Sequence, residues 1–319
     1  MEPPVVEIIL PTYNGEAFLA AQVDSILGQR ERNWRLLLSD DGSTDGTRAI
    51  IARYVAHHPH RMRDVSPPRA FHDVTRHVEY LLGLTRSRYI MFCDQDDLWL
   101  PDKIERSLSA LRALEDQAGD RGTMTPLLVH TDLRVVNARL QPITPSLWQA
   151  AKMPPAPTFG GLLFHNTVTG CATTVNRAAV ECSLPFPSEA IMYDWWIALV
   201  VQGLGRMRAL PGPGLLYRQH GSNLLGARAL DGRSLAADVI SGRAPEFYRL
   251  MRRRLLRTQR QTRAYLTRYE EALTPEVAAV AARYANLDRW GFYTRRRYAL
   301  QDGYFDHWWV TKWMMTLFV

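Results

Sequence analysis

Cysteine is scarce in this chain, with only three residues among 319. No two of them have the CxxC spacing, and an odd number of thiols cannot pair completely; they are Cys93, Cys171 and Cys182. These features argue against a disulfide framework and against a cysteine zinc site. We therefore expect the protein to work in a reducing compartment, the cytoplasm.

Long apolar runs are also absent. The most apolar stretch near the C-terminus, Trp308–Val319, has 12 residues and contains Lys312, whereas about 20 residues are needed to span a bilayer. Val5–Leu10 is preceded by Glu2 and lacks a basic flank, so it does not resemble a signal peptide. We expect neither a transmembrane helix nor secretion.

The composition excludes a disordered chain, because 46% of residues are hydrophobic and 22% are charged. The net charge of +7 is uneven: residues 243–319 carry 15 Arg and Lys against 7 Asp and Glu. Length and this change in composition predict a large domain over residues 1–242 and a basic, aromatic, helical region over 243–319.

Strand-like and helix-like segments alternate along the first 120 residues, which predicts an α/β fold with a mostly parallel sheet covered by helices on both faces. The predicted strands are Val5–Leu10, Trp34–Leu38 and Tyr89–Cys93. The predicted helices are Phe18–Leu27, Thr47–His57, Val74–Leu84 and Pro101–Leu114. Further along are a strand at Leu127–His130, a proline-rich connection at Pro142–Pro157 and a helix at Asp194–Gln202. Ligands bind such sheets beyond the carboxyl ends of the strands.

Two acidic turns follow predicted strands. In Cys93-Asp94-Gln95-Asp96-Asp97, three carboxylates lie within four residues, which suits a hard cation such as Mg²⁺ or Mn²⁺. The alternative is that Asp96 or Asp97 only caps the next helix. In the turn at residues 39–47, Asp40 or Asp41 could accept the imide N–H of a uracil or thymine base, whereas Ser43 and Asp45 are better explained as helix caps.

Two later segments also carry polar chemistry. Asp194 stands alone beside Trp195 and Trp196, and burial would raise its pKa toward the range of a general base; spacing alone favours a helix N-cap instead. In the segment at residues 217–223, Arg218 could bind a diphosphate and His220 a metal. On its own, a His-Gly pair in such a segment is more often part of an ordinary surface loop.

The order and spacing of these motifs resemble the family 2 glycosyltransferases. Pro11-Thr12-Tyr13-Asn14-Gly15, the turn at 40–47 and the turn at 93–99 carry the likeness, which extends from Val5 to about Gly226. The closest likeness is to the rhamnosyltransferase-like members. It implies a GT-A fold, an inverting reaction, a nucleotide-sugar part at about 1–120 and an acceptor part at about 121–242.

The resemblance also implies roles for individual residues. The nucleotide donor would be bordered by Pro11, Thr12, Tyr13, Asn14, Asp40, Asp41, Asp94, Gln95 and Arg218. Asp96 and His220 would hold Mn²⁺ or Mg²⁺, and Asp194 would be the base. Acceptor or sugar contacts would come from Asp132, Thr169, Gly170, Trp195 and Trp196. For Asp132 a structural role, and for Gly170 a plain bulge, explain the residue about as well.

The function so predicted moves a sugar, with rhamnose as one candidate, from a dTDP- or UDP-linked donor to a hydroxyl of a bacterial cell-surface polysaccharide or a lipid-linked glycan. A nucleotidyltransferase is an alternative, but residues 11–17 lack the Lys or Arg that usually meets a triphosphate. A non-catalytic nucleotide-binding or glycan-binding module is the other alternative.

The C-terminal region contains eight arginines between Phe247 and Tyr269 and no acid. With the tryptophans near the end, this pattern suits an anionic membrane surface, which would place the protein peripherally on the inner face of the plasma membrane. The alternative is a charged helix packed on the main domain. Nucleic acid is a weaker reading because no binding motif accompanies the charge.

Overall fold

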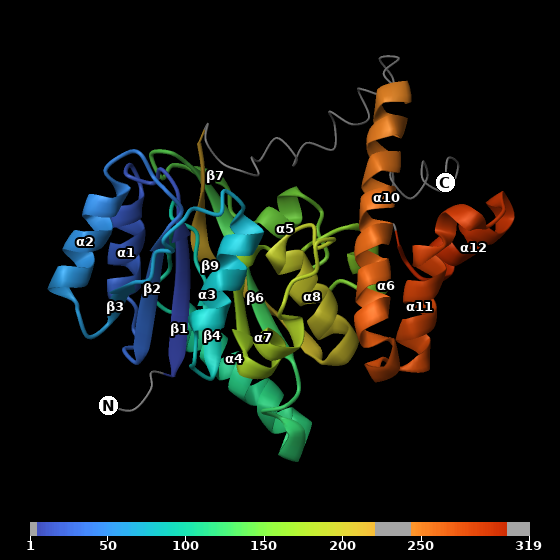
Figure 1. Cartoon of the computed structure of the whole chain (residues 1–319), viewed down its shortest axis with the longest axis horizontal. Coiled ribbons are helices and arrows are strands. Elements are labelled where there is room, and N and C mark those ends of the chain that lie inside the picture. Colours follow the sequence, from blue (N-terminus) through green and yellow to red (C-terminus); the bar gives the residue numbers. More distant parts are fainter. Residues whose placement is uncertain (1–4, 221–243, 305–319) are drawn as a thin grey trace.

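The structure, a computed structural model, describes residues 5–220 and 244–304, and within them a central sheet carries helices on both faces (Figure 1). The strands are β1 (Val6–Thr12), β2 (Trp34–Asp40), β3 (Met62–Asp64), β4 (Tyr89–Phe92), β5 (Leu98–Trp99), β6 (Leu127–Asn137), β7 (Pro142–Thr144), β8 (Thr173–Asn176) and β9 (Arg206–Gln219). The helices of the main body are α1 (Leu19–Leu27), α2 (Thr47–His57), α3 (Val74–Leu84), α4 (Lys103–Ala118), α5 (Leu147–Ala150), α6 (Phe159–Phe164), α7 (Arg177–Ser183) and α8 (Tyr193–Leu204). The C-terminal helices are α10 (Ala244–Tyr269), α11 (Pro275–Ala285) and α12 (Phe292–Gln301). Short 3-10 helices are η1 (Gly119–Arg121), η2 (Gly170–Ala172), η4 (Glu270–Ala272) and η5 (Leu287–Arg289).

The strand order in the described sheet is β3-β2-β1-β4-β8-β6-β9-β5, and β7 pairs with β6. β3, β2, β1 and β4 are parallel, while β8 is antiparallel to both β4 and β6. Because β8 reverses direction between them, β4 and β6 run the same way and end at the same edge. The predicted mostly parallel α/β sheet is confirmed, and its carboxyl edge collects the polar turns.

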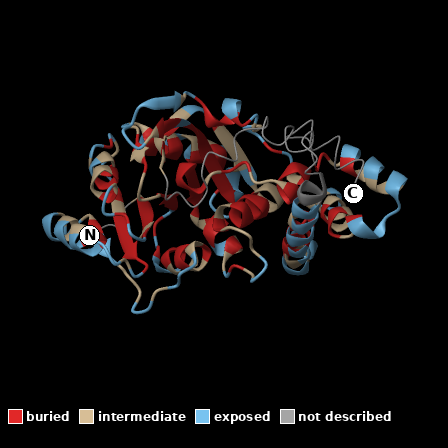
Figure 2. Ribbon diagram, turned by 90° about the horizontal axis from the view of Figure 1, so that it is seen from above, coloured by how far each residue is buried: buried red, intermediate tan, exposed pale blue. Residues whose placement is uncertain are grey.

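Two hydrophobic cores flank the sheet. One contains side chains of β1 and β4 packed against α3, α7, α8 and α10, and the other contains their alternate neighbours packed against α1 and α4. Ile9 and Ile8 illustrate the alternation, since successive strand residues point to opposite faces. Figure 2 shows the interior of the molecule in red, with exposed residues on the outer helices. Burial on both faces explains why β1 reads as a continuous apolar run.

Strand β9 was not predicted, because Pro211, Gly212, Pro213 and Gly214 interrupt it. The structure accommodates them at an irregularity where Thr131 pairs with Leu210 and the next residue, Asp132, pairs with Pro213. Prolines are tolerated in sheets at such bulges. The expected loop around Arg218 is wrong, because Tyr217 to Gln219 belong to β9 and pair with β6. Residues 221–223 of that segment lie outside the described residues.

The predicted helical C-terminal region is confirmed, and α10 packs on α6 and α8. Tyr265 of α10 is fully buried and contacts the ring of Trp196. On the same inner side, the Arg254 Nη2 lies 2.6 Å from Nδ1 of His165, and the guanidinium lies over Phe164. Among the residues that the structure describes, no helix is both long and apolar enough to cross a bilayer.

Candidate active site

The turns that follow β1 and β2 are joined by reciprocal hydrogen bonds. The Asn14 N–H donates to Ser43 Oγ at 2.8 Å, and the Thr44 N–H donates to Asn14 Oδ1 at 2.9 Å. Gly15 N–H donates to Thr47 Oγ1 at 2.8 Å. Asn14 has a positive φ of 48°, a conformation that Asn tolerates better than most residues. The two turns therefore form one surface at the carboxyl edge.

Both acids of the second turn are buried and hydrogen-bonded. Asp40 accepts from the Ser43 N–H at 2.9 Å and from Thr12 Oγ1 at 3.1 Å. Asp41 accepts from the N–H groups of Phe71 and His72 at 2.5 and 2.8 Å. These contacts hold the 40–43 turn and the 70–72 segment in place. Thr12 is also buried, whereas Tyr13 is 52% exposed.

The expected helix caps differ from those in the structure. Asp45 accepts from the Thr47 N–H at 3.0 Å, but the N-cap of α2 is Gly46, so Asp45 holds the turn before the helix rather than capping it. Ser43 instead donates to Asp40 at 2.5 Å. Helix α4 begins after Asp102, so neither Asp96 nor Asp97 caps it, and the N-cap of α8 is Met192 rather than Asp194.

The acidic turn after β4 is tied to the first turn by Gln95. Its Oε1 accepts from the Tyr13 N–H, and its Nε2 donates to the Tyr13 carbonyl, both at 2.9 Å. Asp94 is half-buried, and burial together with the negative charges of Asp96 and Asp194 raises its pKa to about 7. Pro11, within β1, is half-buried beside this junction.

A buried polar cluster lies behind the acidic turn. Ligand atoms of Asp94, Asp97 and Cys171 lie within 4.8 Å of one another. Asp97 is fully buried, and burial raises its pKa well above its usual value. Lys103, the first residue of α4, is also fully buried over the Trp99 ring, and desolvation lowers its pKa to about 8.

Strand β9 brings two predicted residues to the acidic turn. The Arg218 N–H donates to Asp97 Oδ1 at 3.1 Å, and its Nε donates to the Asp96 carbonyl at 2.8 Å. His220 Nε2 lies 2.8 Å from Asp96 Oδ2, and its ring packs on Phe18. Arg218 is 6% exposed, so it supports the backbone of the turn.

The donor set suits a hard divalent cation. Two ligands of an octahedral Mg²⁺, each about 2.1 Å from the ion, are about 3 Å apart, close to the 2.8 Å between Asp96 Oδ2 and His220 Nε2. Carboxylate and imidazole match Mg²⁺ or Mn²⁺ better than a thiol does. Asp96 and His220 therefore suit such an ion by donor type and spacing, whereas the three-residue group whose ligand atoms lie within 4.8 Å of one another consists of Asp94, Asp97 and Cys171.

Asp194 lies in the first turn of α8, and three N–H groups hold its carboxylate. They belong to Trp195 at 2.6 Å, Gly170 at 3.0 Å and the Asn166 side chain at 3.0 Å. Burial outweighs these bonds and raises the pKa of Asp194 to about 6. The negative charge of Asp194 also contributes to the raised pKa of Asp94, so the two carboxylates lie close enough to interact electrostatically.

The predicted sugar contacts of the two tryptophans are wrong. Trp196 is fully buried and donates its indole N–H to the Ser183 carbonyl at 3.0 Å. Trp195 is 6% exposed and donates to the Leu162 carbonyl at 2.6 Å. Both rings belong to the core between the sheet and α10, because that face of α8 is apolar.

The other predicted acceptor residues lie along the same edge. Thr169 precedes η2, and Gly170 approaches Tyr193 so closely that a Cβ there would lie 2.0 Å from the tyrosine hydroxyl. Asp132 of β6 accepts from the Leu133 and Trp148 N–H groups at 2.7 and 3.2 Å.

Sequence reasoning missed Lys103, Cys171, Phe18 and the role of Asn166. Lys103 looks like an ordinary solvent-facing lysine at a helix start, and its burial depends on the packing of α4 under the acidic turn. Asn166 belongs to a segment already noted in the sequence, but its bond to Asp194 spans 28 residues. No local signal predicts such pairings.

The comparisons with known proteins agree with this geometry. Residues 7–121 match the family description Glycosyl transferase family 2. The putative glycosyltransferase EpsE of Bacillus subtilis is 33% identical over 152 residues, covering 48% of this chain and 53% of EpsE. The putative teichuronic acid biosynthesis glycosyltransferase TuaG of the same organism is 27% identical over 63% of this chain and 73% of TuaG. The dTDP-rhamnosyl transferase RfbG of Shigella flexneri is 31% identical over a segment that covers 32% of this chain and 36% of RfbG. The chain thus spans about half the length of EpsE and about a third of RfbG.

Solved structures share the fold. TarS 1-349 of S. aureus in complex with UDP has a TM-score of 0.54 at 14% identity, covering 93% of this chain and 91% of that chain. The mannosyltransferase PcManGT of Pyrobaculum calidifontis, in complex with GDP-Man and Mn²⁺, has a TM-score of 0.50 at 19% identity, covering 98% of this chain and 88% of PcManGT. These likenesses concern the fold and confirm the predicted GT-A type. The family match itself concerns residues 7–121, and the structural likeness extends the shared fold over most of the chain.

Proposed function

We propose that this protein transfers a sugar from a nucleotide-diphosphate donor to a hydroxyl of a cell-surface glycan or its lipid-linked precursor, with inversion at the anomeric carbon. One observation carries the proposal: the Asp194 carboxylate, with a pKa raised to about 6, lies close enough to the acidic turn for its charge to raise the pKa of Asp94. A base beside a diphosphate site is the arrangement that a single displacement needs.

In this reaction Asp194 takes the proton of the acceptor hydroxyl as the oxygen forms its bond to the anomeric carbon. The bond from that carbon to the diphosphate oxygen breaks, and the nucleoside diphosphate leaves from the opposite face. Asn166 and the Gly170 N–H orient the carboxylate for this step. The surface formed by Tyr13, Asn14 and the 40–43 turn would take the nucleoside.

Asp96 and His220 would hold Mg²⁺ or Mn²⁺, which would offset the negative charge of the diphosphate. Arg218 keeps the Asp96 carbonyl and the Asp97 carboxylate in place. Its charge, near the acidic turn, adds to the attraction for a leaving diphosphate.

For the donor we propose a UDP- or dTDP-linked sugar, with dTDP-rhamnose as the first to test. The matched segment shared with the dTDP-rhamnosyl transferase RfbG supports this order of testing. The name of TuaG, a teichuronic acid biosynthesis protein, supports a cell-surface acceptor.

The substitution Asp194→Asn tests the proposed base. We expect donor turnover to fall about 10²- to 10⁴-fold, the usual contribution of a general base, while nucleoside diphosphate still binds. Asp116→Asn, an exposed carboxylate on α4, is the matched control. Turnover of the Asp194 variant at the wild-type rate would remove Asp194 from the mechanism.

The products distinguish the alternative functions. A glycosyltransferase releases nucleoside diphosphate from a nucleotide sugar, a nucleotidyltransferase releases pyrophosphate from a nucleoside triphosphate, and a binding module releases neither. Measuring both products with a panel of donors therefore decides among the three.

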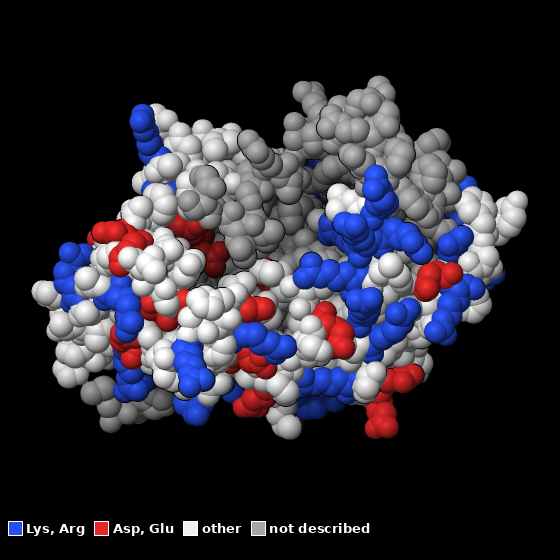
Figure 3. Space-filling model, turned by 45° about the horizontal axis from the view of Figure 1, so that its top comes forward, with Lys and Arg blue, Asp and Glu red and all other residues white. Residues whose placement is uncertain are grey.

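We also propose that α10 faces an anionic membrane surface, where lipid-linked acceptors would be presented. On α10, Arg252, Arg253, Arg257 and Arg260, which we call the arginine face, are exposed at helical spacing and carry no ion pair within the described residues. Lys and Arg gather over the C-terminal helices in Figure 3. Basic residues near an anionic surface contribute about 1 kcal/mol each.

A further inference from the structure

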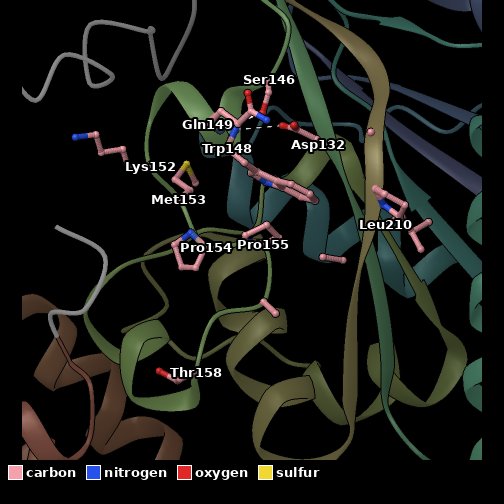
Figure 4. Close-up of a pocket in the computed structure, with 14 residues that line it drawn as sticks. Asp132, Ser146, Trp148, Gln149, Lys152, Met153, Pro154, Pro155, Thr158 and Leu210 are labelled. Carbon is pink, nitrogen blue, oxygen red and sulfur yellow. Dashed lines mark hydrogen bonds between the residues drawn. The ribbon is translucent and has the colours of Figure 1, made fainter.

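A cavity of about 730 Å³ lies between α5, the segment that follows it and the irregular part of β9 (Figure 4). Its volume falls in the range of about 300–1,000 Å³ that is typical of small-molecule sites. The bulge opposite Asp132 shapes one wall, where β9 departs from the register of β6 between Leu210 and Pro213. Bulges of this kind recur next to active sites.

The lining combines an aromatic ring with a few polar groups. The Trp148 indole points into the space between β9 and the segment that carries Pro155 (Figure 4). Asp132, Gln149 and Lys152 line the same cavity. The contacts of Asp132 to the Leu133 and Trp148 N–H groups use Oδ1, which leaves Oδ2 for a ligand.

This chemistry fits a sugar ring. Apolar faces of a pyranose pack on an indole, while carboxylate, amide and ammonium groups bond its hydroxyls. The lining offers no cluster of cations for a phosphate, because Lys152 is the only Lys or Arg among the lining residues.

The strand order relates the cavity to the acidic turn. Met91 of β4 pairs with Thr174 of β8, which pairs with Val129 of β6. Asp94 follows the end of β4 and Asp132 lies three residues beyond Val129 in β6, so both lie toward the carboxyl edge, with β8 between their strands.

Between these two strands, η2 immediately precedes β8, and the N–H of its first residue, Gly170, binds Asp194. The order along the edge is therefore acidic turn, base and cavity. Because inverting transfer brings the acceptor from the side opposite the leaving diphosphate, the cavity lies where the acceptor would extend.

We propose that this cavity binds a pyranose unit of the acceptor glycan, hydrogen-bonded by Asp132 and Gln149, and that the sugar contacts only the small part of Trp148, 8% of its surface, that remains exposed in the cavity wall. The inference rests on the proposed transferase function, and it adds the chemical class of the acceptor and the residues that select it.

The test uses saturation-transfer NMR on the full chain with UDP and Mg²⁺. The probes are the methyl glycosides of rhamnose, glucose, galactose and N-acetylglucosamine. We expect at least one to bind the wild-type protein, and Asp132→Asn, Gln149→Ala and Trp148→Phe each to weaken that binding about tenfold, the loss expected for one good contact. Gln117→Ala, an exposed glutamine on α4, should bind as the wild type does.

Two outcomes overturn the proposal: no probe binds the wild-type protein, or binding survives all three cavity substitutions. Release of nucleoside diphosphate from the donor in water, measured on the same preparations, separates this failure from failure of the proposed function. The cavity variants should keep donor hydrolysis within about twofold of the wild-type rate. Gln149 is exposed, so its variant tests the site even if a change at Trp148 disturbs folding.

Discussion

Asn166→Ala should move the pH dependence of the reaction. The Asn166 side chain donates one of the three hydrogen bonds that stabilise the charged form of Asp194. A hydrogen bond to a charged group contributes about 1.5–3 kcal/mol, and 1.36 kcal/mol corresponds to one pKa unit. Loss of the bond should therefore raise the pKa of Asp194 from about 6 by about one to two units.

The sign follows from the role of the base, which acts only when ionised. Raising its pKa moves the acid limb of kcat/KM to higher pH, so at pH 7 the ionised fraction should fall from roughly nine tenths to between one tenth and one half. Above the new pKa the rate should recover. Release of nucleoside diphosphate, measured from pH 5 to 9, gives the profile directly.

The pH profile distinguishes an effect of Asn166 on the pKa of Asp194 from an effect on the local structure. Asn166 also accepts from the Val168 N–H at 3.0 Å, so the variant could lose rate by loosening that segment. A lower plateau with an unchanged pKa would refute the reasoning. Asn33→Ala, an exposed residue before β2, should leave both plateau and pKa unchanged.

Three further results are expected. Asp96→Asn and His220→Ala should weaken Mg²⁺-dependent UDP binding about tenfold by calorimetry and abolish the response to a chelator; a chelator response like that of the wild type would contradict the metal site. Replacing the arginine face with Gln should reduce flotation with vesicles containing anionic lipid by up to about 10³-fold, at about 1 kcal/mol per arginine; equal flotation would exclude membrane binding through α10. The matched control replaces four exposed arginines at the other end of the molecule, Arg48, Arg53, Arg63 and Arg69. Gly203→Ala should lower the free energy of unfolding in urea by roughly 1–3 kcal/mol, because its Cβ would lie 1.9 Å from the hydroxyl of the fully buried Tyr265. An increase of about 1 kcal/mol, the usual gain in helix propensity, would show instead that α10 can move away from α8 at no cost.

The sequence predicts the elements of the nucleotide half well because local patterns determine them. Thr47–His57 and Val74–Leu84 match α2 and α3, and the apolar runs give β1, β2 and β4 within a few residues. β3, β5 and β7 escape prediction because each has three residues or fewer, and β8 escapes because three of its four residues are polar. β9 escapes because its prolines and glycines resemble a loop until β6 pairs with it.

The candidate site divides in the same way. Acids at strand ends are visible in the sequence, and the acidic turn and Asp194 do lie at one edge. Burial is not visible, because it depends on contacts between distant segments. Trp196 and Lys103 show the two errors: an aromatic residue that seems available for a sugar is in the core, and a lysine that seems exposed is under the acidic turn.

The contacts of Arg218 have a consequence for how the protein is made. Its backbone N–H and its Nε support Asp97 and Asp96, which precede it by 121 and 122 positions. During synthesis, the acidic turn leaves the ribosome long before the strand that braces it. The segment 7–121, although it carries the family match, therefore lacks the residues that brace the acidic turn. In the proposed function, the chain would become able to bind a donor only late in synthesis, once β9 has joined the sheet.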